Sequence, residues 1–141
     1  MQKILKAVGL SALLFAVGAG ADDSAARFDG DWATVVACAM AAGAVAYSYE
    51  FSSSVKNGVL HGEHGIKGAP GWLRLDGQIQ PDGSASIAAH GLVGKERAAV
   101  GELPPGAPYH YNIVASFSEN SGTGHRVNVR RCTVTFSRKS S

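Results

Sequence analysis

The sequence lacks the patterns of helical proteins, because it has no heptad repeat and no long amphipathic segment with a helical period. Only the alanine-rich stretch 39–46 suggests a helix, and Gly43 interrupts it, so we expect a short loop or a helical turn there. Folds that connect parallel strands through helices need several helical segments. The absence of such helical segments argues against a βαβ arrangement and favours an all-β protein.

Motifs for nucleophilic catalysis and for phosphate binding are also missing. The sequence has no Gly-x-Ser-x-Gly elbow, and its glycines are not followed by a helix whose N-terminus could hold an anion. Glu50, Glu63 and Asp76 fall on the polar faces of the expected strands, so no buried pair of carboxylates is indicated. We therefore predict that the protein is not an enzyme, and we predict no catalytic residue and no cofactor.

The sequence has no apolar run as long as the roughly 20 residues that a transmembrane helix needs. Its longest run, Ala7–Val17, follows two lysines and precedes Ala19-Gly20-Ala21, which suits a signal-peptide cleavage site. We interpret residues 1–21 as a helical signal peptide and residues 22–141 as one exported domain, periplasmic or extracellular, with no membrane span after cleavage. A retained anchor is the alternative.

The expected mature domain has no excess of charge of either sign. Removal of Lys3 and Lys6 with the signal peptide reduces the 13 lysines and arginines to 11, which equals the number of aspartates and glutamates. A neutral domain gives no electrostatic reason to expect nucleic acid or an anionic membrane surface as a partner. We therefore predict no nucleic-acid partner.

Cysteine is scarce, with Cys38 and Cys132 as the whole complement. Two isolated thiols in an oxidising compartment are expected to pair, and neither cysteine has the neighbouring Cys or His of a metal site. Two free thiols or a metal site are the alternatives. Both cysteines also fall on the inward faces of expected strands. We predict a disulfide that joins the first and last strands beside Trp32.

The sequence is rich in segments whose large and polar residues alternate with period two, which is typical of half-buried strands. Asn57-Gly58 lies between two of them and favours a two-residue hairpin turn, which would place Val55 opposite Leu60. We predict a small antiparallel up-and-down β-barrel of about seven or eight strands. The clearest segments are Phe28–Cys38, Ala46–Val55, Trp72–Gln80, Ser84–His90, Tyr109–Ser118 and His125–Ser137.

The last expected strand, His125–Ser137, needs an irregularity. Val127 and Val129 share one face, whereas Cys132 and Val134 share the other. A β-bulge at Arg130-Arg131 would turn both pairs inward. We also expect Ser121-Gly122-Thr123-Gly124 to form the turn that precedes this strand.

Aromatic residues gather on the expected inward faces in larger number than a filled barrel of this length needs. We interpret the protein as a non-enzymatic binding module that takes a small apolar or aromatic ligand in the barrel, or a protein or glycan at its rim loops. The candidate ligand-binding residues are Tyr47, Tyr49, Phe51, His64, Tyr111 and Phe117.

The sequence His61-Gly62-Glu63-His64 invites a metal-binding interpretation. On an extended strand, however, residues three positions apart point to opposite faces, so both imidazoles cannot reach one ion. We predict no metal site, a surface position for His61, and a position in the lumen or at its rim for His64.

The ends of the domain resemble a known pattern. Gly30-Asp31-Trp32 on the first strand, with an arginine on the last strand, either Arg130 or Arg131, resembles the calycin pattern of lipocalins, avidins and small bacterial metalloprotease inhibitors. In those families the tryptophan packs at the closed end of the barrel with the arginine across it. The resemblance implies structural roles for Trp32 and for one of the two arginines.

A second resemblance covers three short segments. Phe28-Asp29-Gly30-Asp31-Trp32, Leu75-Asp76-Gly77-Gln78-Ile79 and Pro81-Asp82-Gly83-Ser84 are similar to segments of small uncharacterised exported proteins of alphaproteobacteria, for which no activity is implied. Two alternatives to a ligand-binding module remain. One is an inhibitor of an exported protease that uses the segment Asp22–Arg27, and the other is a structural envelope protein without a discrete site.

Overall fold

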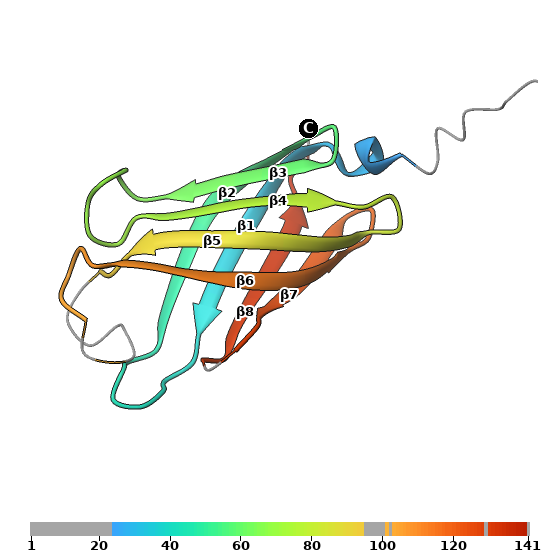
Figure 1. Cartoon of the computed structure of the whole chain (residues 1–141). Helices are drawn as coiled ribbons and strands as arrows, with labels where there is room; N and C mark the ends of the chain where they lie inside the picture. The colour runs from blue at the N-terminus through green and yellow to red at the C-terminus, as the bar shows by residue number, and fades with distance from the viewer. Residues whose placement is uncertain (1–23, 95–100, 102, 129, 141) are drawn as a thin grey trace, which may run out of the picture.

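The protein folds into a closed β-barrel of eight antiparallel strands, each paired with its neighbours in the sequence (Figure 1). The computed structural model describes residues 24–94, 101, 103–128 and 130–140. The predicted all-β, up-and-down architecture is confirmed. The strands are β1 (Gly30–Cys38), β2 (Tyr47–Lys56), β3 (Val59–His64), β4 (Leu73–Ile79), β5 (Ser84–Leu92), β6 (Pro108–Phe117), β7 (Ser121–Arg126) and β8 (Cys132–Arg138), and a short 3₁₀ helix, η2 (Ala25–Phe28), precedes them.

The segment expected to be a signal peptide, residues 1–21, lies outside the described residues. Within the part of the chain that the structure describes, no helix has the length and the apolar character needed to cross a bilayer. The alanine-rich stretch 39–46 is a loop, as expected, in which Ala41 and Ala44 form an isolated bridge.

The β2–β3 hairpin forms at the Asn-Gly pair that the sequence singles out. Asn57 and Gly58 have φ values of 51° and 76°, which is the backbone conformation of a type I′ turn, and Val55 lies opposite Leu60 as predicted. The Asp29 carboxylate accepts hydrogen bonds from the backbone N–H groups of Asn57 (2.8 Å) and Gly58 (3.1 Å). This turn is therefore fixed to the start of β1.

The region predicted as one bulged strand after a glycine turn is two strands, so both the bulge and the turn were wrong. The chain reverses instead at Ser118, whose backbone N–H donates to the Ser121 carbonyl (2.7 Å). Gly122 lies inside β7 and faces the Phe117 ring, where an added Cβ would come within 2.8 Å of ring carbon. The glycine therefore makes room for an aromatic ring, which the sequence pattern could not distinguish from a turn.

One end of the barrel, the tryptophan end, is sealed by aromatic packing. Trp32 has no exposed surface, and its indole Nε1 donates to the Phe28 carbonyl (2.9 Å) at the end of η2. The Phe117 ring meets the Trp32 ring edge-on at 5.4 Å between centroids, and Phe136 packs behind it. In Figure 1, η2 lies in blue against this end of the barrel. The predicted role of Trp32 as an end plug is consistent with this packing.

The arginine across Trp32 is Arg138, which corrects the expectation of Arg130 or Arg131. Its guanidinium carbon lies 4.7 Å from the centroid of the Trp32 ring. Its nitrogens donate to the backbone carbonyls of Glu119 (2.7 Å), Asp29 (2.7 Å) and Arg27 (2.8 Å). Because β8 runs antiparallel to β1, the end of β8 rather than its start lies opposite Trp32.

The middle of the barrel is filled by inward side chains. Val36, Leu75, Ile87 and Ile113 have no exposed surface. One polar pair is buried among them, and it is satisfied internally, because the Thr34 and Ser53 hydroxyls hydrogen-bond at 2.7 Å. Burial of the apolar groups supplies the main stabilisation of such a core.

The predicted disulfide between Cys38 and Cys132 is present, and the Cα atoms of these directly opposed residues on β1 and β8 are 4.0 Å apart. Its expected place beside Trp32 was wrong. Cys38 lies six residues farther along β1, or about 20 Å away at the rise of an extended strand. The disulfide therefore joins β1 to β8 at the other end of the barrel.

We predict that Arg138→Ala lowers the free energy of unfolding by about 2–3 kcal/mol, because three carbonyls lose a charged donor and Trp32 loses its cation contact. Arg138→Lys should recover part of this loss. Urea denaturation measures both values. The control is Arg131→Ala, an exposed arginine at the other end, for which we expect a change within about 0.5 kcal/mol. Equal stability of the Arg138→Ala variant and the wild type would contradict the role assigned to Arg138.

Reduction of the disulfide should lower the free energy of unfolding by roughly 4 kcal/mol, since the bond closes a chain segment of 94 residues in the unfolded state. Denaturation with and without dithiothreitol measures the difference. A Cys38→Ser, Cys132→Ser double variant should show the same loss and no further response to reductant. A protein whose thiols react with a maleimide before reduction would not contain this bond.

Candidate functional site

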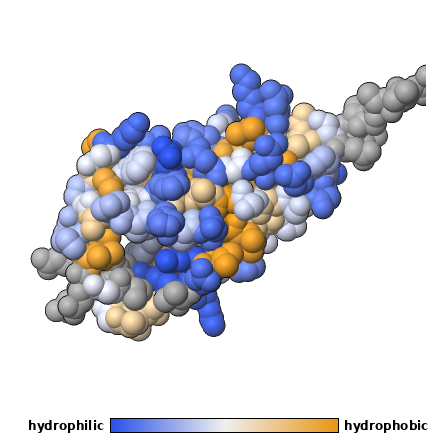
Figure 2. Space-filling view, viewed as in Figure 1, coloured by the Kyte–Doolittle hydropathy of each residue, from blue (hydrophilic) through white to orange (hydrophobic). Residues whose placement is uncertain are grey.

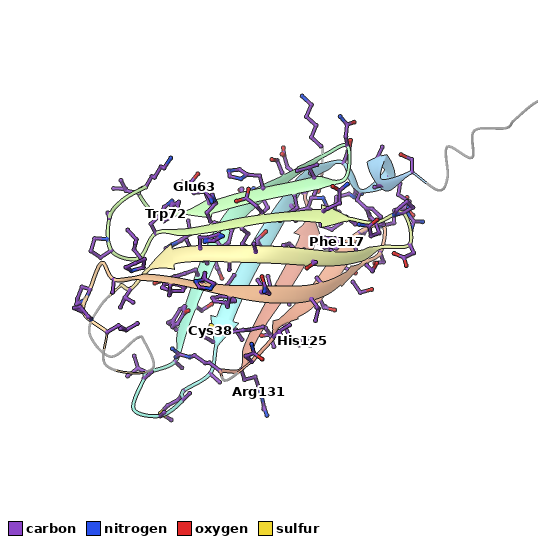
Figure 3. The ribbon with its side chains drawn as sticks, in the orientation of Figure 1. Cys38, Glu63, Trp72, Phe117, His125 and Arg131 are labelled. Atoms are coloured by element: carbon purple, nitrogen blue, oxygen red, sulfur yellow. A yellow bond between two sulfur atoms is a disulfide. The ribbon has the colours of Figure 1, made fainter. Side chains whose placement is uncertain are left out.

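All four tyrosines of the chain lie at the end of the barrel opposite Trp32, which we call the tyrosine end. Tyr47 and Tyr49 begin β2, and Tyr109 and Tyr111 begin β6. Within each pair the residues are two positions apart, so alternation directs both side chains inward. We refer to the four as the tyrosine cluster. Figure 3 shows Cys38, His125 and Arg131 toward this end and Phe117 toward the other.

The rings of the tyrosine cluster form two pairs, of which only Tyr109 with Tyr111 is stacked, because Tyr47 and Tyr49 are tilted by 45°. Tyr109 and Tyr111 are nearly parallel, with 6.0 Å between centroids, and Tyr47 and Tyr49 are 5.0 Å apart. The His64 ring stacks on Tyr49 at 4.0 Å, and its Nδ1 lies 3.0 Å from the Gly71 carbonyl oxygen. The tyrosine end therefore presents flat aromatic surface with a few polar atoms at its edges.

A glycine on the neighbouring strand makes room for Tyr109. Gly91 on β5 lies opposite Tyr109, and a Cβ at this position would lie 2.4 Å from the ring carbon that carries the hydroxyl. Any larger residue would displace the ring. The inward position of Tyr109 is thus fixed by its cross-strand partner as well as by alternation.

Arg130 is a structural residue of the tyrosine end. Its side chain is buried, with 3% of the residue exposed, and its guanidinium carbon lies 5.0 Å from the centroid of Tyr47. It donates hydrogen bonds to the carbonyls of Ala39 (2.9 Å) and Val45. These bonds hold the loop between β1 and β2 against the segment that precedes β8, so the predicted structural role for Arg130 has a basis, although not beside Trp32.

Arg126, at the end of β7, has a different environment. Its guanidinium carbon lies 4.4 Å from the centroid of Tyr111, but its buried Nε has no hydrogen-bond partner. The ion pairs among the described residues do not include Arg126. The hydroxyl of Tyr111, whose ring this guanidinium contacts, is also buried and has no hydrogen-bond partner. Buried polar atoms are nearly always hydrogen-bonded in folded proteins, so this adjacent pair needs an explanation.

The tyrosine cluster keeps its protons at neutral pH. Burial, and next the nearby Tyr47, raises the pKa of Tyr111 and of Tyr109 well above the usual value of a phenol. Arg126 and Arg130 lower the pKa of Tyr111 and so oppose this shift in part. Burial likewise raises the pKa of Tyr47, with Arg130 opposing, and of Tyr49. Tyr47 and Tyr109 already share a side-chain hydrogen bond, whereas the protonated hydroxyl of Tyr111 has no partner and can donate to a ligand.

The structure brings together five of the six residues predicted to bind a ligand: Tyr47, Tyr49, Phe51, His64 and Tyr111. Phe51 is 6.0 Å from His64 between ring centroids. Phe117 is not among them, because it packs against Trp32 at the other end, where it is 5% exposed. Strand parity placed Phe117 correctly on the inner face but could not tell which end of the barrel its position on β6 reaches.

Sequence reasoning missed Tyr109 and Arg126. Tyr109 shares its parity with Tyr111, so alternation alone could have included it. Arg126 shares its parity with the inward glycines of β7, but the prediction of a turn at Ser121-Gly122-Thr123-Gly124 hid this strand. Arg131 is exposed and is not part of the tyrosine cluster.

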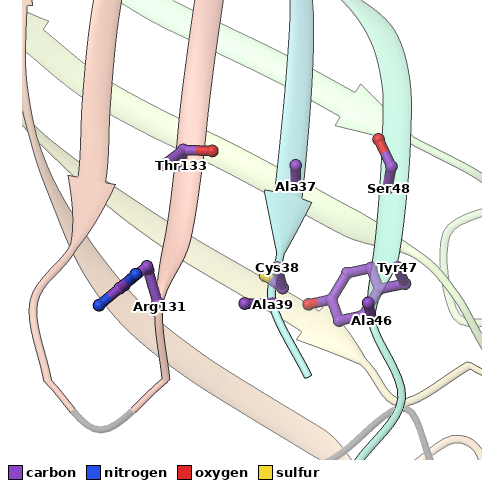
Figure 4. Close-up of a pocket in the computed structure, with 8 residues that line it drawn as sticks. All are labelled: Ala37, Cys38, Ala39, Ala46, Tyr47, Ser48, Arg131 and Thr133. Carbon is purple, nitrogen blue, oxygen red and sulfur yellow. The ribbon is translucent and has the colours of Figure 1, made fainter. Parts of the chain in front are cut away.

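Two depressions lie on the surface at the tyrosine end. The first, of about 530 Å³, is lined by outward residues of β1, β2 and β8, such as Ala37 and Ser48, and also by Tyr47 of the tyrosine cluster (Figure 4). Arg131 is its only charged lining residue. The second, of about 440 Å³, is lined by Arg126, Arg130 and their neighbours between β7 and β8. The second therefore leads solvent to the guanidinium groups beside the tyrosine cluster.

The two histidines of the His61-Gly62-Glu63-His64 segment point to opposite sides of the wall, as alternation requires. His61 lies outside and contacts the Asp76 carboxylate (2.7 Å), whereas His64 lies inside against Tyr49. Trp72 donates to the Glu63 carboxylate (2.6 Å) on the same outer wall. Among residues 24–94, 101, 103–128 and 130–140, no three side chains of His, Cys, Asp or Glu are grouped as a metal site would need.

We predict that Tyr109 and Tyr111 resist ionisation until the barrel unfolds at alkaline pH. Because their folded pKa values are raised, the unfolded state loses these phenolic protons first, and stability falls as the pH rises above about 10. Their share of the phenolate absorbance should therefore appear in one cooperative step together with the loss of far-ultraviolet circular dichroism. Unfolding in guanidinium should restore titration of all four tyrosines near pH 10. Ionisation of all four near pH 10 in a protein that keeps its native spectrum would contradict the burial of Tyr109 and Tyr111.

The tyrosine end thus combines stacked aromatic rings, neutral phenols and one arginine with an unpaired donor. These groups offer apolar ring surface and hydrogen-bond donors at the same end of the barrel. No protein-family model, curated protein or solved structure matches this chain, so its function has to be inferred from the geometry of the site.

Proposed function

We propose that this protein is an exported, non-enzymatic binding module that takes a small aromatic or apolar ligand among the tyrosine cluster. The observation that supports this most directly is the segregation of aromatic residues between the two ends. At the tryptophan end, Trp32 and Phe117 are packed and buried beneath Arg138. At the tyrosine end, Tyr47, Tyr49 and the neighbouring rings are only partly buried.

The packed middle of the barrel limits the size of the ligand. Residues such as Leu75, Ile87 and Val134 fill the interior and have no exposed surface. A ligand therefore contacts the rings at the tyrosine end and does not extend along the axis of the barrel. Flat aromatic walls with a few polar atoms are typical of small-molecule sites.

The tryptophan end supports the proposed relation to calycins. Trp32 lies beneath the guanidinium of Arg138, which is the arrangement that the resemblance implies, although the arginine is a different one. Arg138 also bonds to carbonyls of the segment that precedes β1. The disulfide between Cys38 and Cys132 supports the proposed export, because such bonds persist in oxidising compartments.

The protease-inhibitor alternative receives less support. It requires the segment Asp22–Arg27 to be available to an enzyme, but its described part is held against the barrel. Residues 25–28 form η2, and the Arg27 side chain donates to the Pro81 carbonyl (2.8 Å). The Arg27 carbonyl in turn accepts from Arg138.

A partner at the rim loops is the second candidate, and exposed apolar side chains favour it. Met40 and Ile66 are 76% and 78% exposed on the loops that follow β1 and β3, both at the tyrosine end. In Figure 2, hydrophobic residues appear at the loop end of the molecule on the left and again along the barrel wall. Isolated apolar residues are common on protein surfaces, so this observation is weaker than the aromatic segregation.

Titration with the neutral fluorophore N-phenyl-1-naphthylamine tests the proposal. We expect enhanced, blue-shifted fluorescence with a dissociation constant in the micromolar range. Tyr49→Ala and His64→Ala should each weaken binding about fivefold to tenfold, because they remove one ring of the stacked pair.

His110→Ala is the matched control, since this exposed imidazole lies on the outer wall. It should bind the fluorophore as the wild type does. Binding that is absent, or that is unchanged in Tyr49→Ala and His64→Ala, would exclude a ligand site at the tyrosine end. A Met40→Ser, Ile66→Ser variant that alone loses binding would assign the site to the rim loops instead.

A further inference from the structure

Two buried polar atoms without a partner at the tyrosine end belong to side chains that contact each other. Tyr111 is 5% exposed, and its hydroxyl has no partner. Arg126 lies opposite Ile113, the next inward residue of β6, so its side chain falls on the same inner face as Tyr111. The guanidinium carbon lies 4.4 Å from the centroid of the Tyr111 ring.

Of the two arginines here, Arg126 is the one with an unused buried donor. Arg130 donates its Nε hydrogen bond to the Ala39 carbonyl and another bond to the Val45 carbonyl. The Nε of Arg126 has no such acceptor, and the ion pairs of the described residues offer it no carboxylate. The charge on Arg126 therefore has no counterion from the described part of the chain.

The chemistry that satisfies both atoms is an oxygen acceptor with a negative charge. The buried phenol of Tyr111 stays protonated, so its O–H group can donate a hydrogen bond to an acceptor on the ligand. Arg126 offers N–H donors in the planar arrangement that carboxylates and phosphates accept. The depression of about 440 Å³ reaches Arg126 from the surface and is also lined by Arg130 and Arg131. Arg130 is engaged with two backbone carbonyls and Arg131 is exposed, so the one unused buried donor is that of Arg126, and its guanidinium balances the single charge of a carboxylate.

We propose that the ligand of the tyrosine end is an aromatic or apolar carboxylate, whose oxygens accept hydrogen bonds from Arg126 and Tyr111. The inference rests on the proposed function, because it names the chemical class of the ligand for the same site. The rings of Tyr49 and His64 hold the apolar body, and Arg126 selects for the acid over its neutral analogues.

Competition against N-phenyl-1-naphthylamine tests this with three matched compounds: naphthalene-1-acetate, naphthalene-1-acetamide and 1-naphthyl phosphate. In the wild type, we expect the acetate to displace the fluorophore at a concentration at least tenfold lower than the amide. Arg126→Met, which can still pack against Tyr111, should abolish this preference, with each compound's displacement referred to the fluorophore affinity measured for that variant. Arg126→Lys serves as a second variant that keeps the charge and should retain part of the preference.

Tyr111→Phe separates ligand binding from stability. Removal of a buried, unpaired hydroxyl should raise the melting temperature of the free protein or leave it unchanged, while acetate binding weakens severalfold. A structural hydroxyl would instead lower the melting temperature and leave the preference for the acid intact. Arg131→Met is the control for general electrostatic attraction at this end, because the exposed guanidinium of Arg131 lies outside the tyrosine cluster. This variant should keep the preference for the acid.

The outcomes distinguish this inference from the proposed function. Equal competition by the acid and the amide, with fluorophore binding that still depends on Tyr49, would contradict the inference that the ligand is a carboxylate. The proposed binding function would still stand. Stronger competition by 1-naphthyl phosphate than by the acetate would also contradict this inference and would indicate that the ligand is a phosphate ester. Absence of fluorophore binding together with absence of binding by all three compounds in calorimetry would overturn both.

Discussion

The pairing of β1 with β8 is the constraint on which the rest of this structure depends. It closes the barrel, and it is reinforced at both ends by different chemistry. At the tryptophan end, the last residue of β8, Arg138, stacks on Trp32 and bonds to the segment before β1. At the tyrosine end, Cys38 and Cys132 join the same two strands covalently. Closure removes the exposed sheet edges that would otherwise invite aggregation.

The two ends use arginines to different effect. Arg138 donates hydrogen bonds to three backbone carbonyls over the packed aromatic core of the tryptophan end. Arg130 likewise donates a hydrogen bond to the loop after β1. The buried Nε of Arg126, by contrast, has no hydrogen-bond partner among the described residues. The described residues of the two ends thus also differ in hydrogen-bond satisfaction, which adds to the aromatic segregation that supports the proposal of a binding site at the tyrosine end.

Much of the fold could be predicted from local patterns. Alternation identified the inward faces of Phe28–Cys38 and of the β2 segment, and the Asn57-Gly58 turn fixed the register of the hairpin between β2 and β3. The candidate site was partly predictable for the same reason, since alternation placed Tyr47, Tyr49 and Tyr111 inside. The glycines of β7 were not predictable, because a glycine required by a close ring and a glycine required by a turn look alike in sequence.

The sequence by itself determined that the protein is an all-β barrel, which side chains of most strands face inward, and that its two cysteines pair; the faces of β7 were not foreseen. Only the tertiary structure decided what lies at which end. Strand direction and closure placed Arg138 rather than Arg130 over Trp32, and they separated Phe117 from the tyrosines. The physical reason is that alternation reports which side of a strand a residue occupies, whereas its height along the barrel depends on register with strands that are distant in the sequence.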